Sequence, residues 1–266
     1  MYMVINMYAK FDDSFKKNEG DLINHDQKES YRINKFISDA GYASRRESDR
    51  LVQSGVVTVN GVVAQTGMQV YMDDVVKVNG DLIKPLNHRV YIALNKPVGI
   101  ECITDINKKG NIVSFMNYPE MIFPVCRLDK DSSGLILLTN DGDIVNKILR
   151  SENDHDKEYL VTVDKKITPL FLEQMEKGVV IYNPVAHRNQ RTLPAKTFKL
   201  DDFTFRLIIN QGLNRQIRRM SQALGYQVKE LKRIRVMNIK LDDLKDGYWR
   251  YLSSSELKEL NKSLLK

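Results

Sequence analysis

Two helical patterns lie near the start of the chain, ahead of the first strand signals. The first pattern carries three apolar residues at helical spacing: Ile33, Phe36 and Ile37. A second helix is predicted to begin after Ser44, because Ser44 and Glu47 have the spacing of a capping box. Such a box satisfies free backbone N–H groups at a helix start. Gly41 and Gly55 follow the two patterns and predict where each helix ends.

Two Asn-Gly pairs, Asn60-Gly61 and Asn79-Gly80, each separate two runs of β-branched residues. Asn-Gly is the strongest short hairpin signal, because both central residues of that turn need a positive φ angle. Two helices and two hairpins are enough for one compact unit over residues 31–86.

A larger domain is predicted beyond residue 87. The apolar run at 134–140 lacks alternation, which is typical of a central strand buried on both faces, whereas residues 203–209 alternate. Helices are expected at three places: after Asp141 or Asp143, from Thr168 to Gly178, and over residues 214–226. Strands outnumber helices in an irregular order, so we predict an α+β fold with a large mixed, mostly antiparallel sheet.

These patterns divide the chain into four parts. Residues 1–30 are polar and charged without a sustained period, which predicts a disordered tail. The expected boundaries are a tail at 1–30, a small helical and β-hairpin domain at 31–86, a larger domain at 87–255 and a C-terminal tail at 256–266.

Charge and cysteine usage narrow the class of protein. The net charge is +7, and residues 205–240 hold nine Lys or Arg and one Glu, which predicts a basic face for a polyanion such as nucleic acid. No window has the ~20 apolar residues that cross a bilayer, and no secretory signal precedes the first helix. Two cysteines without a CxxC pair suit a reducing cytoplasm.

The segment CRLDKDSSGLILLTNDG, residues 126–142, carries the main candidate for chemistry. Asp129 is either a turn former or a carboxylate held at the mouth of the sheet. Tyr159 and the arginine-rich segment 215–219 have equally ordinary interpretations, as a core tyrosine and a solvated helix face. Lys96 and Pro97 are expected to form a structural turn. The sequence contains no nucleotide-binding or zinc-protease motif, and we predict neither a metal nor a cofactor.

Taken together and in order, four segments resemble the bacterial RsuA-type pseudouridine synthases. They are ALNKPVGI, RLDKDSSGLILLTNDG, KEYLVTV and QGLNRQIRRM. Residues 32–61 resemble the RNA-binding domain first described in ribosomal small-subunit protein four. Three segments are most similar to family members that act on large-subunit (23S) ribosomal RNA. One departure is Cys126, where relatives usually have Gly.

The resemblance implies isomerisation of a uridine in RNA. The C1′–N1 bond breaks, the uracil rotates, and C5 joins C1′, which requires a flipped-out base. It implies Asp129 as the nucleophile, Tyr159 beside the uracil and Arg218 as the ion-pair partner of Asp129. Attack at C1′ and a glycal route both stay open. Three residues are expected around the substrate: Arg127, Leu128 and Ile217.

Eight basic residues are predicted to contact the RNA backbone: Arg45, Arg46, Arg50, Arg215, Arg219, Lys232, Arg233 and Arg235. We therefore expect Arg218→Ala to cost more activity than Arg233→Ala. The expected partner is naked or partly assembled ribosomal RNA, bound by a cytoplasmic monomer. Alternatives are a small-subunit rRNA or tRNA anticodon substrate, a catalytically silent ribosome-associated protein, and a metal-dependent nuclease.

Overall fold

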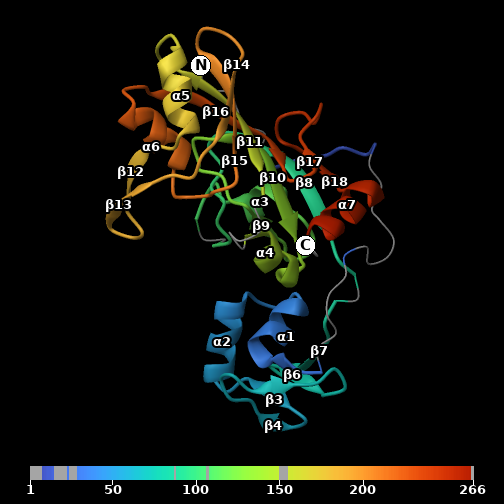
Figure 1. Ribbon diagram of the computed structural model, residues 1–266. Helices are drawn as coiled ribbons and strands as arrows, with labels where there is room; N and C mark the ends of the chain where they lie inside the picture. Colours follow the sequence, from blue (N-terminus) through green and yellow to red (C-terminus); the bar gives the residue numbers. More distant parts are fainter. Residues whose placement is uncertain are drawn as a thin grey trace.

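The computed structural model describes residues 8–14, 23, 29–86, 88–105, 108–149 and 155–264. Within these residues the chain forms a small N-terminal domain and a larger domain built on one extended sheet (Figure 1). The predicted α+β class is confirmed.

The small domain contains the two helices and both hairpins that the sequence predicts. Its helices are α1 (Ile33–Asp39) and α2 (Arg45–Gln53), and the Ser44 side chain caps α2 by accepting from the Glu47 N–H. Four strands form a sheet in the order β4-β3-β6-β7: β3 (Val57–Val59), β4 (Val62–Val63), β6 (Val76–Val78) and β7 (Asp81–Ile83). A separate pair joins β2 (Tyr31–Arg32) and β5 (Gln69–Val70).

The larger domain is organised around a mixed sheet of ten strands within the described residues. The main path runs β1-β18-β8-β10-β16-β11-β15-β14, while β9 pairs with β10 and β17 with β16. The strands are β1 (Lys10–Phe11), β8 (Tyr91–Lys96), β9 (Phe123–Val125), β10 (Ser133–Thr139), β11 (Lys157–Val163), β14 (Lys196–Lys199), β15 (Thr204–Ile209), β16 (Val228–Val236), β17 (Ile239–Lys240) and β18 (Tyr248–Tyr251). Only the β1–β18 and β10–β16 pairs among them are parallel, as a mostly antiparallel sheet requires.

Among the described residues, five helices cover the two faces of this sheet, and each face has its own apolar core. Helices α3 (Ile112–Met116), α5 (Pro169–Glu176) and α6 (Gln216–Ala223) contribute to one core, while α4 (Gly142–Leu149) and α7 (Ser254–Leu264) contribute to the other. The apolar strand at 134–140 lies at the centre as predicted, since β10 contributes side chains to both cores. A two-stranded hairpin of β12 (Val180–Asn183) and β13 (Arg188–Arg191) lies beside α6.

The prediction that residues 1–30 form a disordered tail is wrong for the part that the structure describes. Strand β1 adds a parallel edge strand to β18, and the Ala9 N–H donates to the Phe115 carbonyl. The Phe11 ring lies 4.5 Å from the Trp249 ring, and Ile23 is 3% exposed in the core shared by α4 and α7. A two-residue strand is too short to produce a periodic signal, and its partner is distant in the sequence. The remaining residues of the predicted tail lie outside the described residues.

The predicted C-terminal tail at 256–266 is also wrong. Helix α7 continues to Leu264, and three leucines at helical spacing are buried against the sheet: Leu257, Leu260 and Leu264. This spacing is that of an amphipathic helix, so the sequence itself carries the signal for α7.

The two domains meet where α1 and α2 approach α4. The Lys35 ammonium lies 3.2 Å from Asp143 Oδ2, and the Arg45 guanidinium packs beside Gly142. Among the described residues, no helix is both long enough and apolar enough to span a membrane.

Candidate active site

Asp129 lies in the loop between β9 and β10, on the side of the sheet where β10 begins. Leu128 turns into the core and is 7% exposed, whereas the Asp129 side chain remains 32% exposed. The Asp129 carbonyl accepts from the Ser132 N–H at 3.1 Å, and the Lys130 carbonyl accepts from the Gly99 N–H at 2.8 Å. These backbone bonds fix a tight turn with the carboxylate at its rim.

Gly134 explains how closely the turn approaches the next strand. A Cβ atom at this position would lie 2.2 Å from the Arg233 carbonyl oxygen, and the Gly134 φ angle is +102°. Only glycine fits such a contact without moving the backbone. The loop therefore enters β10 directly against β16.

The Arg218 guanidinium contacts Asp131 and not Asp129, so the expected direct ion pair is wrong. Arg218 Nε lies 3.4 Å from Asp131 Oδ2, and Arg218 Nη2 donates to the Asp131 carbonyl at 2.7 Å. Because its guanidinium also donates to the Val228 carbonyl at 3.1 Å, Arg218 ties the loop to the start of β16. The sequence could not separate the two acids, which lie two residues apart.

Arg215 is the cation that approaches Asp129 within the described site. Its Nη1 lies 3.6 Å from Asp129 Oδ2, and its guanidinium donates two hydrogen bonds to the Asp131 carboxylate at 2.8 and 3.0 Å. The hydrogen bond from Arg215, helped by the charge of Arg218, lowers the pKa of Asp131 and keeps this carboxylate ionised. Asp131 is thus a bridge between the loop and α6.

Arg233 is buried beneath the loop, so the prediction that it binds the RNA backbone is wrong. It is 1% exposed, its Nε donates to the Leu135 carbonyl at 2.8 Å, and its Nη2 donates to the Cys126 carbonyl at 2.5 Å. The register of β16 places it opposite Tyr159 of β11 and beside Gly134 of β10. The guanidinium therefore supports the loop from below.

Tyr159 lies at the base of the same site and is 7% exposed. Burial raises the pKa of its phenol, the Asp129 charge adds to this shift, and the Arg233 cation opposes it. The phenol is consequently neutral near pH 7. Leu128 and Ile217 belong to the same apolar core as Tyr159, and Ile217 is 4% exposed.

Lys96 is a buried basic group that the sequence interpretation treated only as part of a turn. Its ammonium is fully buried and donates to the carbonyls of Pro97 and Ile100 at 2.8 and 3.0 Å. Burial lowers its pKa to about 8, although the charges of nearby acids oppose this shift. No sequence period marks the residue, because a lysine at the end of a strand usually faces water.

The remaining residues that were predicted to contact RNA differ in how far their side chains are exposed to solvent. Four are exposed, namely Arg45, Arg46 and Arg50 on α2 and Lys232 on β16. Arg235 instead donates to Glu158 Oε2 at 2.7 Å and to the Met237 carbonyl at 2.7 Å, which leaves 19% of its side chain facing solvent. Arg127 is exposed beside Asp129.

In the described part of the chain, no group of three or more His, Cys, Asp or Glu side chains is placed to hold a metal ion.

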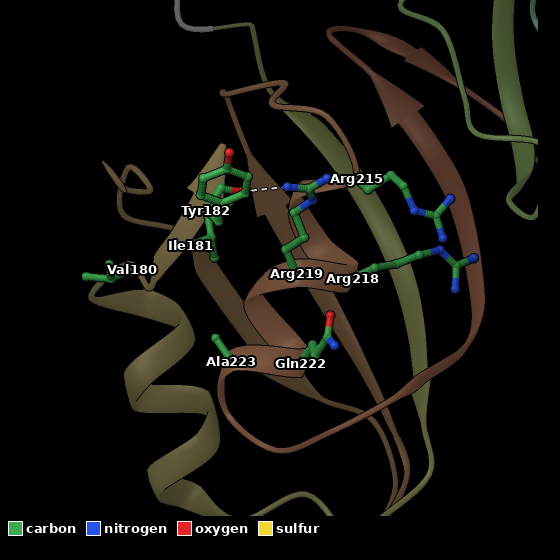
Figure 2. A pocket seen from close by; sticks show the side chains of 8 residues that line it. All are labelled: Val180, Ile181, Tyr182, Arg215, Arg218, Arg219, Gln222 and Ala223. Atoms are coloured by element: carbon green, nitrogen blue, oxygen red, sulfur yellow. Dashed lines mark hydrogen bonds between the residues drawn. The ribbon is translucent and has the colours of Figure 1, made fainter. Parts of the chain in front are cut away.

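A hollow of about 440 Å³ lies between α6 and β12, next to the Asp129 loop (Figure 2). Its lining includes the stems of Arg215 and Arg218, together with Arg219 and Tyr182. Figure 2 shows Arg215 and Arg218 extending together away from β12, whereas Arg219 extends toward Tyr182. The sequence interpretation missed Tyr182, because an isolated tyrosine in a short strand carries no distinctive signal.

The site combines the solvent-accessible carboxylate of Asp129 with the buried Tyr159 and Arg233, and exposed basic residues lie on both domains. This arrangement is suited to chemistry on a nucleotide within RNA. Two family profiles match the chain: RNA pseudouridylate synthase over residues 90–223 and S4 domain over residues 32–76. The first match includes Asp129, Tyr159 and Arg218. The chain belongs to the RNA pseudouridylate synthase family, whose activity is the isomerisation of uridine in RNA to pseudouridine.

Individual relatives agree with this assignment. The chain is 52% identical over 235 residues to the dual-specificity RNA pseudouridine synthase RluF of Escherichia coli K12. This alignment covers 88% of this chain and 79% of that protein. It is 37% identical over 239 residues to the ribosomal large subunit pseudouridine synthase B of Bacillus subtilis 168, covering 86% and 95% respectively. A solved pseudouridylate synthase superposes with a TM-score of 0.64 at 30% identity, covering 86% of this chain and 99% of the other.

Proposed function

We propose that this protein converts a specific uridine of large-subunit (23S) ribosomal RNA to pseudouridine in the cytoplasm. The printed name of the B. subtilis relative supports the large-subunit target. A relative from Haemophilus influenzae at 30% identity is named for the small subunit, which makes small-subunit RNA the alternative. The name of the E. coli relative includes the term dual-specificity, which favours testing a second RNA. The tRNA anticodon that the sequence left open is that second substrate.

Asp129 is the proposed reacting group because its carboxylate is part-exposed and its charge reaches the buried Tyr159 phenol. The Asp131 carboxylate, in contrast, is engaged in two hydrogen bonds from Arg215. Loss of the base leaves an electron-poor C1′, which a nearby carboxylate stabilises or attacks. The C1′–N1 bond breaks, the C5–C1′ bond forms, and the proton at C5 leaves to solvent while N1 regains one. No oxidant or reductant is consumed, so atoms and electrons balance within the uridine.

Arg218 and Arg215 act in this proposal as positioning residues. Their contacts to Asp131 hold the loop that carries Asp129, and Arg215 also places a positive charge 3.6 Å from the Asp129 carboxylate. Tyr159 supplies a neutral aromatic ring against which the flipped uracil rests. Arg127, exposed next to Asp129, fills the space that the base vacates or contacts neighbouring phosphates.

Release of tritium from C5 tests this function. Purified protein is incubated with a 23S rRNA transcript that contains [5-³H]uridine, and the modified position is mapped in the product. We expect stoichiometric release at one or a few sites, in the presence of EDTA, and no release by Asp129→Asn. Asp201→Asn, an exposed carboxylate in the β14–β15 turn, is the matched control and stays active. EDTA-sensitive strand cleavage without tritium release would instead indicate a nuclease.

A further inference from the structure

We propose that the hollow between α6 and β12 is a subsite for a nucleotide of the substrate RNA that flanks the target uridine. The base of this nucleotide stacks on Tyr182, and its phosphate binds Arg219. This inference rests on the proposed function, because it assumes that a target uridine reaches Asp129.

The hollow has the size and the surface that a nucleotide requires. Its volume of about 440 Å³ lies within the usual range for small-ligand pockets, roughly 300–1,000 Å³. The Ile181 side chain is 4% exposed and belongs to the core, so the floor is firmly packed. Tyr182, on the next position of β12, is 52% exposed and turned to the opposite side. An exposed tyrosine on a rigid strand is a ready stacking surface.

Arg219 lines the hollow and forms no ion pair with an acidic side chain of the described residues. Its Nη1 donates to the Tyr182 carbonyl at 2.5 Å and its Nη2 to Asn214 Oδ1 at 3.0 Å, and both acceptors are uncharged. Arg215 and Arg218, by contrast, already form ion pairs with Asp131. The hydrogen bond to Tyr182 also fixes the guanidinium next to the aromatic residue, as Figure 2 shows. The acceptor is the main-chain carbonyl of Tyr182, so a cation lies at the same position of β12 as an exposed aromatic residue. Cations and aromatic rings are the groups that bind single-stranded nucleic acid.

The hollow is connected to the catalytic loop through Arg215. The stem of Arg215 lines the hollow, and its guanidinium contacts Asp131 and lies 3.6 Å from Asp129 Oδ2. The Arg215 side chain therefore reaches from the hollow to the Asp129 loop. Its length is similar to the distance between neighbouring nucleotides in an RNA strand. This places the occupant beside the target uridine and not at a remote part of the RNA.

The adjoining hairpin extends the same surface. Arg188 and Arg191 of β13 are exposed, and β13 pairs with β12 so that Tyr182 lies opposite Asn189. A chain leaving the hollow along this hairpin meets further positive charge, which favours a polyanionic occupant over a neutral small molecule.

The test compares Tyr182→Ala and Tyr182→Phe with Tyr8→Ala, whose tyrosine is similarly exposed at 49% but lies in the N-terminal segment. Binding and single-turnover tritium release are measured with the 23S rRNA transcript. Tyr182→Ala is expected to raise the Kd by about 5- to 50-fold, as loss of one stacked base does. The rate at saturating protein stays within about twofold, and Tyr182→Phe retains tight binding. The slope of log Kd against log salt falls by about 0.7–0.9 in Arg219→Ala and not in Tyr182→Ala.

The outcomes separate the subsite from the proposed function. If Tyr182→Ala binds RNA as tightly as Tyr8→Ala while wild-type protein releases tritium and Asp129→Asn does not, the subsite is refuted and the function stands. If wild-type protein releases no tritium, the function itself fails. A reduced rate at saturation in Tyr182→Ala with an unchanged Kd would also overturn the proposal, because it would indicate loop distortion in place of nucleotide binding.

Discussion

Arg233 lies opposite Tyr159 on the adjoining antiparallel strands β16 and β11, and its guanidinium holds the Cys126 carbonyl at the start of the Asp129 loop. One buried cation thus connects the tyrosine at the base of the site with the loop at its rim. The sequence predicted the opposite, a solvent-facing arginine on a basic strand.

Removing this cation is expected to damage both activity and stability. Arg233→Met leaves the Leu135 and Cys126 carbonyls without their donor, which costs about 2–4 kcal/mol in the free energy of unfolding. We expect tritium release to fall by at least about 100-fold, because Arg233 contacts the loop from inside the core. This loss should exceed that of Arg218→Ala, which reverses the order expected from the sequence. Chemical unfolding and initial rates measure the two effects. Lys229→Met, an exposed lysine of the same strand that is not among the predicted RNA contacts, should change neither substantially.

The lowered pKa of Lys96 predicts how stability depends on pH. In the folded protein this pKa is about 8, below the usual value of 10.5, so the unfolded chain binds more protons between these values. The free energy of unfolding should therefore rise with pH from about 8 to 10.5. Over this range the free energy of unfolding should gain about 3 kcal/mol at most. Urea unfolding at several pH values checks this: Lys96→Met should lack the rise, and Lys232→Met should retain it. An equal slope in both variants would contradict the buried ammonium.

Backbone strain at Cys126 predicts an asymmetry between the two buried cysteines. Both are 6% exposed, but Cys126 alone has a positive φ angle, +54°. A β-branched side chain is poorly tolerated in this conformation, whereas glycine adopts it freely. We expect Cys126→Val to lose about 1–2 kcal/mol more than Cys102→Val, and Cys126→Gly to be milder than either. Thermal unfolding of the three variants decides; equal losses at both positions would show that volume alone matters.

The N-terminal edge strand should contribute measurably to the stability of the larger domain. The Phe11 ring packs against Trp249 at 4.5 Å in a tilted contact and against Tyr251 at 5.6 Å in an edge-on contact. Such aromatic pairs contribute about 0.5–1.5 kcal/mol each. Phe11→Ala is thus expected to lower the free energy of unfolding by about 1–2 kcal/mol. Tyr8→Ala, for which no ring contact is found among the described residues, should cost under about 0.5 kcal/mol. Similar values for the two variants would mean that β1 is not docked in solution.

Local patterns predicted the fold where neighbouring residues determine it. The Ser44 cap, both Asn-Gly turns and the helix after Thr168 are confirmed, because each depends on backbone chemistry within a few residues. Strand β1 was not predictable in this way, since its partner lies more than 200 residues away. The leucines of α7, in contrast, carried a readable period.

The candidate site was predicted in its members more accurately than in its pairings. Asp129, Tyr159 and the α6 arginines do lie together, but Arg218 contacts Asp131, and Arg215 is the cation nearest to Asp129. Charge alone cannot choose between acids two residues apart or between arginines three residues apart. The burial of Arg233 and Lys96 depends on strand register and on carbonyl groups from other segments, which no residue pattern reports.

The central claim is that the Asp129 carboxylate performs the reaction while the surrounding surface only holds the RNA. Tritium release from [5-³H]uridine in a 23S rRNA transcript, measured for Asp129→Asn alongside its affinity for the same RNA, tests this claim most directly. We predict no detectable release and a Kd within a few-fold of wild type. Release at the wild-type rate by the asparagine variant would contradict it.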